Sequence, residues 1–194
     1  VATSPSYGIC SSLIMLLSNH IMNRQWNVLN WNIRGINDPK KWPAIGNKID
    51  ESQCSVLCLQ ETKKESFDST FIRNFCPKRI SKFAFLPSVG AAGGLLVAWN
   101  ESVFSGQIYH VNEFSLSIQF TSTHNGESWI LRNVYGPCQQ NDRILFLNWF
   151  QNFQVLDGDN WLIVGDFNFI IYPHNRSREG GNINDMLLFN EALN

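Results

Sequence analysis

An acidic and an amide side chain stand two positions apart at the end of an apolar run in this 194-residue chain. The run covers residues 161–164 (WLIV), and Gly165, Asp166, Phe167 and Asn168 follow it. Four large apolar residues in succession predict a strand that is buried on both faces. Because alternate residues of an extended chain share one side, Asp166 and Asn168 can act together on a metal ion or a phosphate. The alternative is an Asx turn, in which both side chains bond the local backbone.

Three further apolar segments also end in polar residues. Residues 26–33 contain Asn30 and Asn32 and lead into Arg34, residues 56–59 lead into Gln60, Glu61 and Thr62, and residues 129–134 lead into Tyr135. Sites in sheet proteins are commonly assembled from strand ends and loops that are distant in the sequence. These four strand ends therefore form the candidate site.

Five short motifs contain these strand ends or lie between them. They are WNIRG at residues 31–35, LQET at 59–62, GGLL at 93–96, NVYGP at 133–137 and GDFN at 165–168. In this order the motifs resemble those of the endonuclease/exonuclease/phosphatase family, which includes abasic-site endonucleases and pancreatic-type deoxyribonucleases. The resemblance covers the chain from Gln25 to its C-terminus.

A further match narrows the resemblance. The segment from Asn175-Arg176 through Gly180-Gly181, followed by an apolar helix with Met186, is similar to the endonuclease region of plant LINE-type retrotransposons. A full-length element of this kind would also carry a reverse transcriptase region, which this sequence does not contain. The resemblance implies a DNA-nicking endonuclease as the function and DNA as the partner.

The candidate residues suit the hydrolysis of a phosphodiester beside an oxygen-ligated metal ion. Magnesium prefers oxygen ligands and needs only one or two protein carboxylates, so we predict Mg²⁺, with Mn²⁺ as an alternative, bound by Glu61 with support from Asn32. By resemblance, Asp166 orients or deprotonates the attacking water, Asn168 holds a phosphate oxygen, and Tyr135 donates to the phosphate or the leaving group. The alternatives are that Tyr135 is an ordinary core tyrosine and that Glu61 is an exposed charge at a strand end.

The charge distribution provides no overall attraction to nucleic acid. The formal net charge is -1, whereas dedicated nucleic-acid binders are often clearly basic. Attraction must come from local clusters, which are Lys40-Lys41, Lys63-Lys64, Lys78-Arg79, and Arg176 with Arg178. Each cluster has the alternative of being an ordinary solvated face. We predict that Arg34, Lys63 and Arg176 bind the substrate, and Lys63 is favoured because it lies so close to Glu61.

Cysteine usage and the N-terminal composition bear on where the protein acts. The five cysteines lack both the CxxC spacing of zinc sites and the density of a disulfide framework, so we predict reduced thiols in a nuclear or cytoplasmic protein that is not secreted. The apolar patch at residues 9–17 is interrupted by serines, makes a poor signal peptide, and is too short for a membrane span. Residues 1–24 are therefore expected to be a disordered or loosely helical leader, and residues 25–194 the family domain.

The pattern of residues 25–194 predicts interleaved strands and helices. Helices are expected from Asp38-Pro39 to Ile49, at 67–75, at 142–155 and from Ile183 onward, and further strands at 93–99 and 114–121. The strict alternation of apolar and polar residues in 114–121 predicts a strand with one wet face. The predicted fold class is α+β, a four-layer α/β/β/α sandwich of two mainly antiparallel sheets, which the resemblance also implies.

The C-terminal region departs from the family pattern. The later strands of the family normally bring a further Asp and a closing Ser-Asp-His motif, and neither is found here, so we expect a domain that is incomplete at its C-terminus and misses its last strands. None of the four histidines, at positions 20, 110, 124 and 174, occupies the family position. Two alternatives to an active endonuclease therefore stay open. One is a catalytically inactive, truncated remnant of such a domain, and the other is a phosphatase acting on phosphate esters of lipids or inositols.

Overall fold

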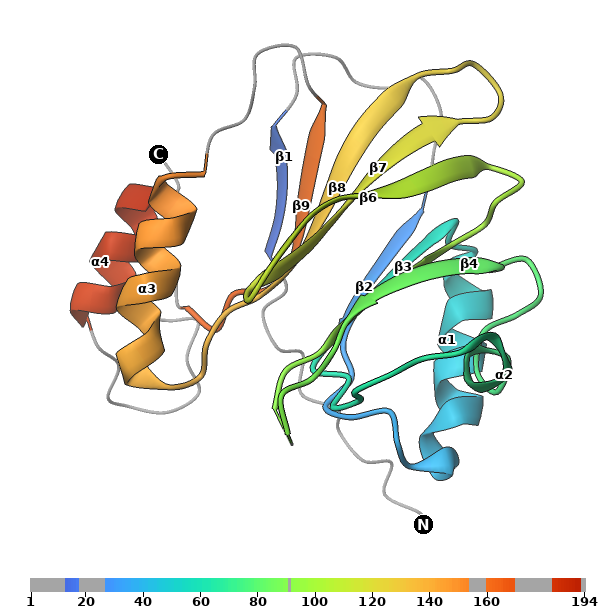
Figure 1. Ribbon diagram of the computed structural model, residues 1–194, viewed down its shortest axis with the longest axis horizontal. Helices are drawn as coiled ribbons and strands as arrows, with labels where there is room; N and C mark the ends of the chain where they lie inside the picture. Colours follow the sequence, from blue (N-terminus) through green and yellow to red (C-terminus); the bar gives the residue numbers. More distant parts are fainter. Residues whose placement is uncertain (1–12, 18–26, 91, 154–159, 170–182, 193–194) are drawn as a thin grey trace.

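Two β-sheets pack face to face, and helices cover the outer face of each sheet (Figure 1). The computed structural model describes residues 13–17, 27–90, 92–153, 160–169 and 183–192. The layers follow the order helix, sheet, sheet, helix, which confirms the predicted α/β/β/α sandwich. Among the strands described, five pairs are antiparallel and two are parallel, so the sheets are mainly antiparallel as predicted.

The smaller sheet has the strand order β2-β3-β5-β4. Its strands are β2 Val28–Asn32, β3 Val56–Gln60, β4 Lys82–Leu86 and β5 Leu95–Trp99. All residues of β3 and β5 are buried, because helices cover one face of this sheet and the larger sheet covers the other. β2 and β3 run parallel, and their last residues, Asn32 and Gln60, lie opposite each other.

The larger sheet has the strand order β1-β9-β8-β7-β6. Its strands are β1 Leu13–Leu17, β6 Phe104–Asn112, β7 Ser115–Ser122, β8 Ser128–Tyr135 and β9 Trp161–Asp166. β8 and β9 run parallel, and their last residues, Tyr135 and Asp166, lie opposite each other. Each sheet therefore contains one parallel pair whose two carboxyl ends are adjacent, and these are the four strand ends that the sequence analysis singled out.

The first described helix is a 3₁₀ turn, η1 Pro39–Lys41, which continues into α1 Trp42–Ser52. The other described helices are α2 Ser69–Ile72, α3 Gln140–Gln151 and α4 Ile183–Ala192. Asp38 caps η1 as predicted, because its carboxylate accepts a hydrogen bond from the backbone N–H of Lys40 at 3.0 Å. None of the described helices has the length and apolar character needed to cross a membrane.

Three apolar clusters fill the spaces between the four layers. The first packs Ile45 and Ile49 of α1 against the smaller sheet, and the second lies between the two sheets around Phe120. The third packs Phe146 of α3 and Phe189 of α4 against the larger sheet. Phe146 is fully buried and Phe189 is 1% exposed, so truncating either ring would open a cavity in this layer.

The polar side of β7 is not wet along its whole length, which corrects the prediction of a solvated face. Ser115 and Ser117 are fully buried, and only Gln119 and Thr121 on that side are partly exposed. The Oγ of Ser117 accepts a hydrogen bond from Nε of Arg132 on β8 at 2.8 Å. A serine hydroxyl is small enough to be buried when it has a hydrogen-bond partner. The alternation of apolar and polar residues alone therefore does not show whether the polar face is exposed to solvent.

Part of the expected leader is a strand, which differs from the disordered or loosely helical segment predicted for residues 1–24. Leu13–Leu17 form β1, which pairs antiparallel with β9 and places Leu13 opposite Gly165. The physical reason is that β9 has an edge beyond β8 whose backbone groups can hydrogen-bond to another extended segment. The other residues of 1–24 lie outside the described part of the chain, and a domain start at residue 25 stays a prediction.

The described cysteines are free thiols, as predicted from their spacing. Cys54, Cys58 and Cys76 are buried, whereas Cys138 is exposed. Burial raises the pKa of Cys76 to about 12, so this thiol stays protonated at neutral pH. The three buried thiols therefore behave as small apolar core residues.

Candidate active site

The four polar strand ends come together where the two sheets meet. The side-chain amide Nδ2 of Asn32, at the end of β2, donates to Oδ2 of Asp166, at the end of β9, at 2.7 Å. This hydrogen bond joins one sheet to the other across 134 positions of sequence. Each parallel pair brings its second strand end to the same place, because carboxyl ends of parallel neighbours lie side by side. The predicted convergence of these segments is therefore present in the structure.

Asp166 is a buried carboxylate held from two directions. Only 2% of the residue is exposed, and besides the bond from Asn32 its Oδ1 accepts the backbone N–H of Asn168 at 3.1 Å. The second bond is the Asx turn that the sequence analysis gave as the alternative to a shared site. Both features are present together, and the turn helps to fix the carboxylate in the orientation in which Asn32 meets it.

Asn168 is turned toward the neighbouring strand end. Its backbone has a φ of 55°, in the left-handed region that Asn tolerates better than most residues. Its Nδ2 donates to the carbonyl oxygen of Gly136 at 2.7 Å, and the N–H of Gly136 donates to the carbonyl of Asp166 at 2.8 Å. These two bonds tie the GDFN segment to the NVYGP segment, so the carboxylate and Tyr135 keep a fixed spacing.

Tyr135 is half-buried and faces the acidic groups of the site. Burial raises the pKa of its hydroxyl well above the usual value, and a contact with Cys138 and the charges of Glu61 and Asp166 raise it further. The hydroxyl lies 3.5 Å from Sγ of Cys138. The phenol is therefore protonated at neutral pH and can donate a hydrogen bond. The charges of Glu61 and Asp166 thus both reach the hydroxyl of Tyr135, and a shared catalytic role of the three stays a prediction.

Glu61 lies in a tightly bent loop that follows β3. Its φ is 55° and that of Lys63 is 53°, both in the left-handed region. The carbonyl of Glu61 accepts the N–H of Gly35 at 2.7 Å, and the N–H of Lys63 donates to the carbonyl of Gly93 at 3.0 Å. The LQET segment, whose Thr62 N–H also donates to the carbonyl of Gly94 at 3.1 Å, is thus fastened to both the WNIRG and the GGLL segments. Three of the five motifs therefore build the backbone frame that carries Glu61.

The lysines near the site have different roles. Nζ of Lys63 forms an ion pair with Oε1 of Glu61 at 3.0 Å, and both side chains are partly exposed. Nζ of Lys64 lies 3.9 Å from the ring centroid of Phe71, which is a cation–π contact away from the carboxylates. Nζ of Lys41 donates to the carbonyls of residues 33, 34 and 35, the last at 2.9 Å, and so braces the loop after β2. Of these three lysines, Lys63 is the one whose ammonium group pairs with a predicted site carboxylate.

The two arginines predicted to bind substrate differ in what the structure says of them. Arg34 is exposed at the rim of the site, and its backbone N–H donates to Oδ1 of Asn32 at 3.1 Å. Asn32 therefore uses both ends of its amide, one toward Arg34 and one toward Asp166. Arg176 lies outside the described residues, so its role stays a prediction.

Sequence reasoning missed a buried amide network directly behind the site. Nε2 of Gln60 donates to Oδ1 of Asn30 and to Oδ1 of Asn133, both at 2.6 Å, and Gln60 and Asn133 are fully buried. Nδ2 of Asn133 donates to the carbonyls of Leu59 and Leu96 in the opposite sheet, at 3.2 and 3.3 Å. The signal was present, because each amide interrupts an apolar run. A buried amide needs partners, and Asn133 finds them across the interface between the sheets, whereas Oε1 of Gln60 and Nδ2 of Asn30 have none among the described residues.

A second unforeseen support comes from the helices. Asp185 of α4 is 8% exposed and accepts hydrogen bonds from Gln140 and from Arg143, the latter at 2.8 Å. The other terminal nitrogen of Arg143 donates to the carbonyl of Asn168 at 3.2 Å. An ion pair between α3 and α4 thus reaches the turn that holds Asp166. No spacing rule links these residues, so the sequence alone does not reveal the contact.

Comparison with known proteins agrees with this geometry. The chain matches the Endonuclease/Exonuclease/phosphatase family over residues 29–182. The chain belongs to this family. A search of curated proteins finds no match to the sequence.

Solved structures of other endonuclease/exonuclease/phosphatase folds superpose on the chain at low sequence identity. The AP endonuclease LMAP from Leishmania major has a TM-score of 0.62 at 13% identity and covers 87% of this chain and 66% of its own. The catalytic domain of Xenopus laevis APE2 has a TM-score of 0.60 at 15% identity, with 86% and 66% covered. The human Nocturnin catalytic domain with bound sulfate has a TM-score of 0.56 at 16% identity, with 81% and 67% covered. The chain thus spans about two thirds of these proteins, and the likeness establishes the shared fold.

The donor atoms of this family member's site suit a hard cation. Among the described residues, no three His, Cys, Asp or Glu side chains lie together as a closed metal cage. Magnesium does not need such a cage, because it keeps several waters and takes one or two carboxylates. The ammonium group of Lys63 already sits 3.0 Å from Oε1 of Glu61, so the site accepts a positive charge beside that carboxylate. The side-chain oxygens of Glu61 and Asn32 are of the type that magnesium takes, and their role as metal ligands stays a prediction.

Gly136 lies where the two halves of the site touch, and we expect its replacement by alanine to destabilise the fold. A Cβ at this position would overlap the carbonyl of Phe167, which belongs to rigid backbone. The strand ends would have to separate and lose the bond from Gly136 to Asp166, so the free energy of unfolding should fall by at least about 2 kcal/mol. Urea denaturation followed by tryptophan fluorescence measures the change.

The matched control is Gly126→Ala. Gly126 has a φ of +73° but nothing within 4 Å of its Cβ position, so only backbone strain of about 1 kcal/mol is expected. Equal destabilisation by the two substitutions would contradict a steric role for Gly136.

Proposed function

We propose that this chain is a magnesium-dependent phosphodiester hydrolase that nicks DNA and derives from a LINE-type retrotransposon. The observation that carries the proposal is the buried Asp166 carboxylate, held by Asn32 at 2.7 Å and sharing its site with Glu61 and the protonated Tyr135. A positioned carboxylate, a second carboxylate for a metal ion and a neutral phenol are the groups that phosphodiester hydrolysis needs.

Asp166 would orient the attacking water and take its proton. The amide of Asn32 and the N–H of Asn168 each donate to a different oxygen of this carboxylate, so it cannot rotate freely. A fixed acceptor places the water without an entropic cost at the moment of reaction. Asn168 would hold a phosphate oxygen, although its Nδ2 is engaged by Gly136 in this structure and would have to turn toward the substrate.

The O–H group of Tyr135 would donate a hydrogen bond to the negative charge that builds up on the phosphate or the leaving group. Its raised pKa keeps the proton in place across the physiological range. A hydrogen-bond donor directed at developing charge in a partly desolvated site stabilises the transition state much more than the same donor in water. Tyr135 thus complements Asp166, which accepts a proton at the other side of the reacting phosphorus.

Glu61 and the amide oxygen of Asn32 would hold Mg²⁺, or Mn²⁺ in its place. When bound, the ion would polarise a phosphoryl oxygen and neutralise charge. Lys63, which pairs with Glu61, would turn to the substrate phosphate, so Lys63 and the exposed Arg34 are the proposed substrate-binding side chains. Arg176 is proposed for the same role from the sequence alone.

DNA is the proposed substrate. Two of the solved structures are named as an AP endonuclease and as APE2, and both share the fold of this chain. A DNA substrate agrees with the predicted nuclear or cytoplasmic location and with the LINE-type motif of residues 175–181. In a full-length element, the nick would supply the primer end for a reverse transcriptase region.

Incubation of supercoiled plasmid with the purified chain tests the proposed function and its metal requirement. We expect magnesium to support conversion to the nicked circle, EDTA to abolish it, and added Mn²⁺ to restore it, because the carboxylates alone do not neutralise the phosphate. Gel electrophoresis of the plasmid forms measures the rate. Absence of nicking by folded protein at all metal concentrations would refute the proposal and favour the inactive remnant.

A further inference from the structure

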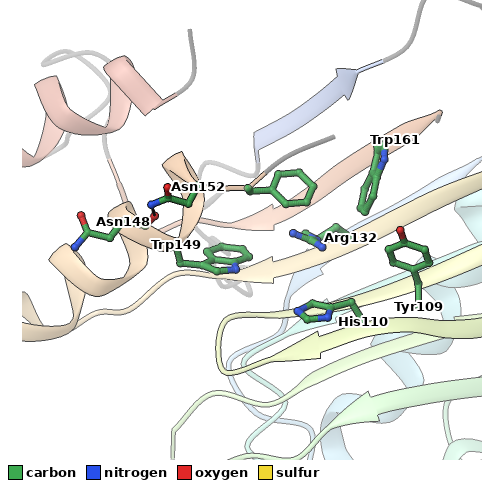
Figure 2. A pocket seen from close by; sticks show the side chains of 8 residues that line it. Tyr109, His110, Arg132, Asn148, Trp149, Asn152 and Trp161 are labelled. Atoms are coloured by element: carbon green, nitrogen blue, oxygen red, sulfur yellow. Dashed lines mark hydrogen bonds between the residues drawn. The ribbon is translucent and has the colours of Figure 1, made fainter. Parts of the chain in front are cut away.

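A second concave site lies on the outer face of the larger sheet, beside the C-terminal end of α3 (Figure 2). Its volume is about 690 Å³. Arg132 of β8 lies at its centre, with Trp149 on one side and Tyr109 and Trp161 on the other. The proposed function makes no use of this pocket.

The pocket and the candidate active site are on opposite faces of the same sheet. Arg132 and Tyr135 both belong to β8 and are three positions apart. Because side chains alternate along a strand, an odd separation directs them to opposite faces. Arg132 reaches the side covered by α3, and Tyr135 reaches the side that packs on the smaller sheet. A ligand in the pocket therefore does not touch Asp166 or Glu61.

Arg132 is a buried cation whose charge has no acidic partner among the described residues. Only 4% of the residue is exposed. Its Nε donates to Oγ of Ser117 at 2.8 Å, and no other hydrogen bond or ion pair of the guanidinium is found in the described part of the chain. Burial lowers its pKa to about 10, so the group still carries its charge at neutral pH. A buried guanidinium with unused donors is a strong site for a planar or tetrahedral oxoanion.

Aromatic rings hold the guanidinium in place and form the walls. The Arg132 guanidinium carbon lies 3.8 Å from the ring centroid of Phe153 and 5.0 Å from that of Trp161. Trp161 in turn makes edge contacts with Phe153 and Tyr109, at centroid distances of 5.1 and 5.6 Å. Trp149 faces the opening from α3. Flat apolar walls around a cation suit a ligand that joins a ring to an anionic group.

A β-bulge brings two neighbouring residues of β6 to this pocket. The register with β7 shifts between Ile108 and His110, so Tyr109 is the extra residue. In a regular strand, neighbouring side chains point to opposite faces, but a bulge turns one of them. Tyr109 and His110 both line the pocket, and both are exposed. The bulge therefore adds a ring and an imidazole to the same side of the sheet.

The rest of the rim, as the described residues form it, is polar and carries no negative charge. Asn148 and Asn152, one turn apart at the end of α3, complete the lining, and no Asp or Glu is among the lining residues. Both amides are exposed, and Nδ2 of Asn152 donates to the carbonyl of Asn148 at 2.7 Å. Amide and imidazole groups can contact both a phosphate and the edge of a base. Among the described residues, the pocket thus has a positive charge at its base and no acidic group at its rim.

We propose that this pocket binds a nucleotide unit, with Arg132 contacting the phosphate and the base stacking on one of the two rings that flank Arg132, Trp149 or Tyr109. Guanidinium groups bind phosphate oxygens with two parallel hydrogen bonds, and aromatic side chains stack on nucleobases of any sequence. The unit can belong to a free nucleotide or to a single strand of nucleic acid, since both present the same phosphate and base. The proposal does not depend on catalysis at Asp166.

Calorimetric titration of the purified chain in EDTA tests the binding. The probes are thymidine monophosphate, thymidine, inorganic phosphate and a short oligothymidylate. We expect the monophosphate to bind at least about tenfold more tightly than thymidine or phosphate alone, because only it uses both the cation and the rings. If the oligothymidylate binds more tightly than the monophosphate, the natural ligand is a single strand. If the two bind equally, the natural ligand is a free nucleotide. No binding of any phosphorylated probe would overturn the proposal.

Two sets of variants locate the binding. Arg132→Gln should weaken the binding of the monophosphate by about 10- to 100-fold, which is the usual effect of losing a hydrogen bond to a charged group. If that variant is unstable, the double variant His110→Ala with Asn152→Ala changes two exposed residues and should weaken monophosphate binding by about 3- to 10-fold. The matched control is His124→Ala with Asn125→Ala, which lies in the exposed turn between β7 and β8 and should leave the binding unchanged. Unchanged binding in the folded His110 and Asn152 variant would overturn the assignment.

A variant of the catalytic site separates this proposal from the proposed function. Asp166→Asn should leave monophosphate binding in EDTA unchanged, because Asp166 lies on the other face of the sheet. Loss of binding in that variant would assign the nucleotide to the active site and overturn the pocket. A chain that fails to nick plasmid but binds the monophosphate through His110 and Asn152 would refute the function and support the pocket.

Discussion

Replacing Asp166 by asparagine is expected to lower the rate of magnesium-dependent plasmid nicking by about 10²- to 10⁴-fold, the usual contribution of a positioned acid–base group. Asparagine has nearly the same shape but cannot accept a proton from water. Its amide would also bring an N–H₂ group toward Asn32 or Asn168, whose nitrogens now donate to the carboxylate at 2.7 and 3.1 Å. Initial rates of nicked-circle formation measure the loss.

The controls separate chemistry from folding. Asp50→Asn removes a carboxylate from α1, where it pairs with Arg79 on the surface, and should leave the rate within about twofold because exposed ion pairs contribute little. Asp166→Ala should be as inactive as Asp166→Asn. If nicking survived in both Asp166 variants at wild-type rate, the proposed general base would be wrong.

Much of the fold could be predicted because its signals are local. The apolar runs at 56–59 and 161–164 are buried strands, and Asp38 with Pro39 starts a helix as capping chemistry requires. The convergence of the strand ends was an expectation drawn from their shared polar endings and from the family resemblance. The hydrogen bond between Asn32 and Asp166 confirms that convergence across the two sheets.

The parts that could not be predicted depend on contacts between distant segments. Gln60 and Asn133 look like interruptions of two apolar runs, and only the face-to-face sheets show that one amide satisfies the other. Lys41 looks like a member of a surface cluster, yet it braces three carbonyls of the loop after β2. A polar residue in a strand or turn has many available partners, and the sequence pattern alone does not choose among them.

The strand β6 was not predicted because it lacks the required pattern. Ile108, Tyr109 and Val111 are all exposed by 40% or more, and the bulge at Tyr109 breaks the alternation that identifies a strand with one buried face. The strand is held mainly by backbone pairing with β7 and by Phe104 at its start, which is fully buried. A strand of this kind can be recognised only from its pairing with a neighbouring strand in the structure.

The second large effect is expected for Glu61→Gln, which removes the charge proposed to bind magnesium. The magnesium concentration for half-maximal nicking should rise by about 10- to 100-fold, the range for weakening a metal site. Glutamine keeps the size of the side chain in its left-handed loop, so the backbone bonds from Gly35 and to Gly93 should persist. Binding of Mn²⁺ without DNA, followed by electron paramagnetic resonance, measures the metal directly.

Glu51→Gln is the matched control for this change. Glu51 also pairs with a lysine, Lys48 at 3.5 Å, but on the exposed face of α1. It should alter neither the magnesium dependence nor the Mn²⁺ signal. If Glu61→Gln reduced nicking at every magnesium concentration but left Mn²⁺ binding intact, Glu61 would act on Lys63 or the substrate and not on the metal. The ion pair of Glu61 with Lys63 gives that outcome a physical reason, because loss of the carboxylate would remove the group that positions the Lys63 ammonium.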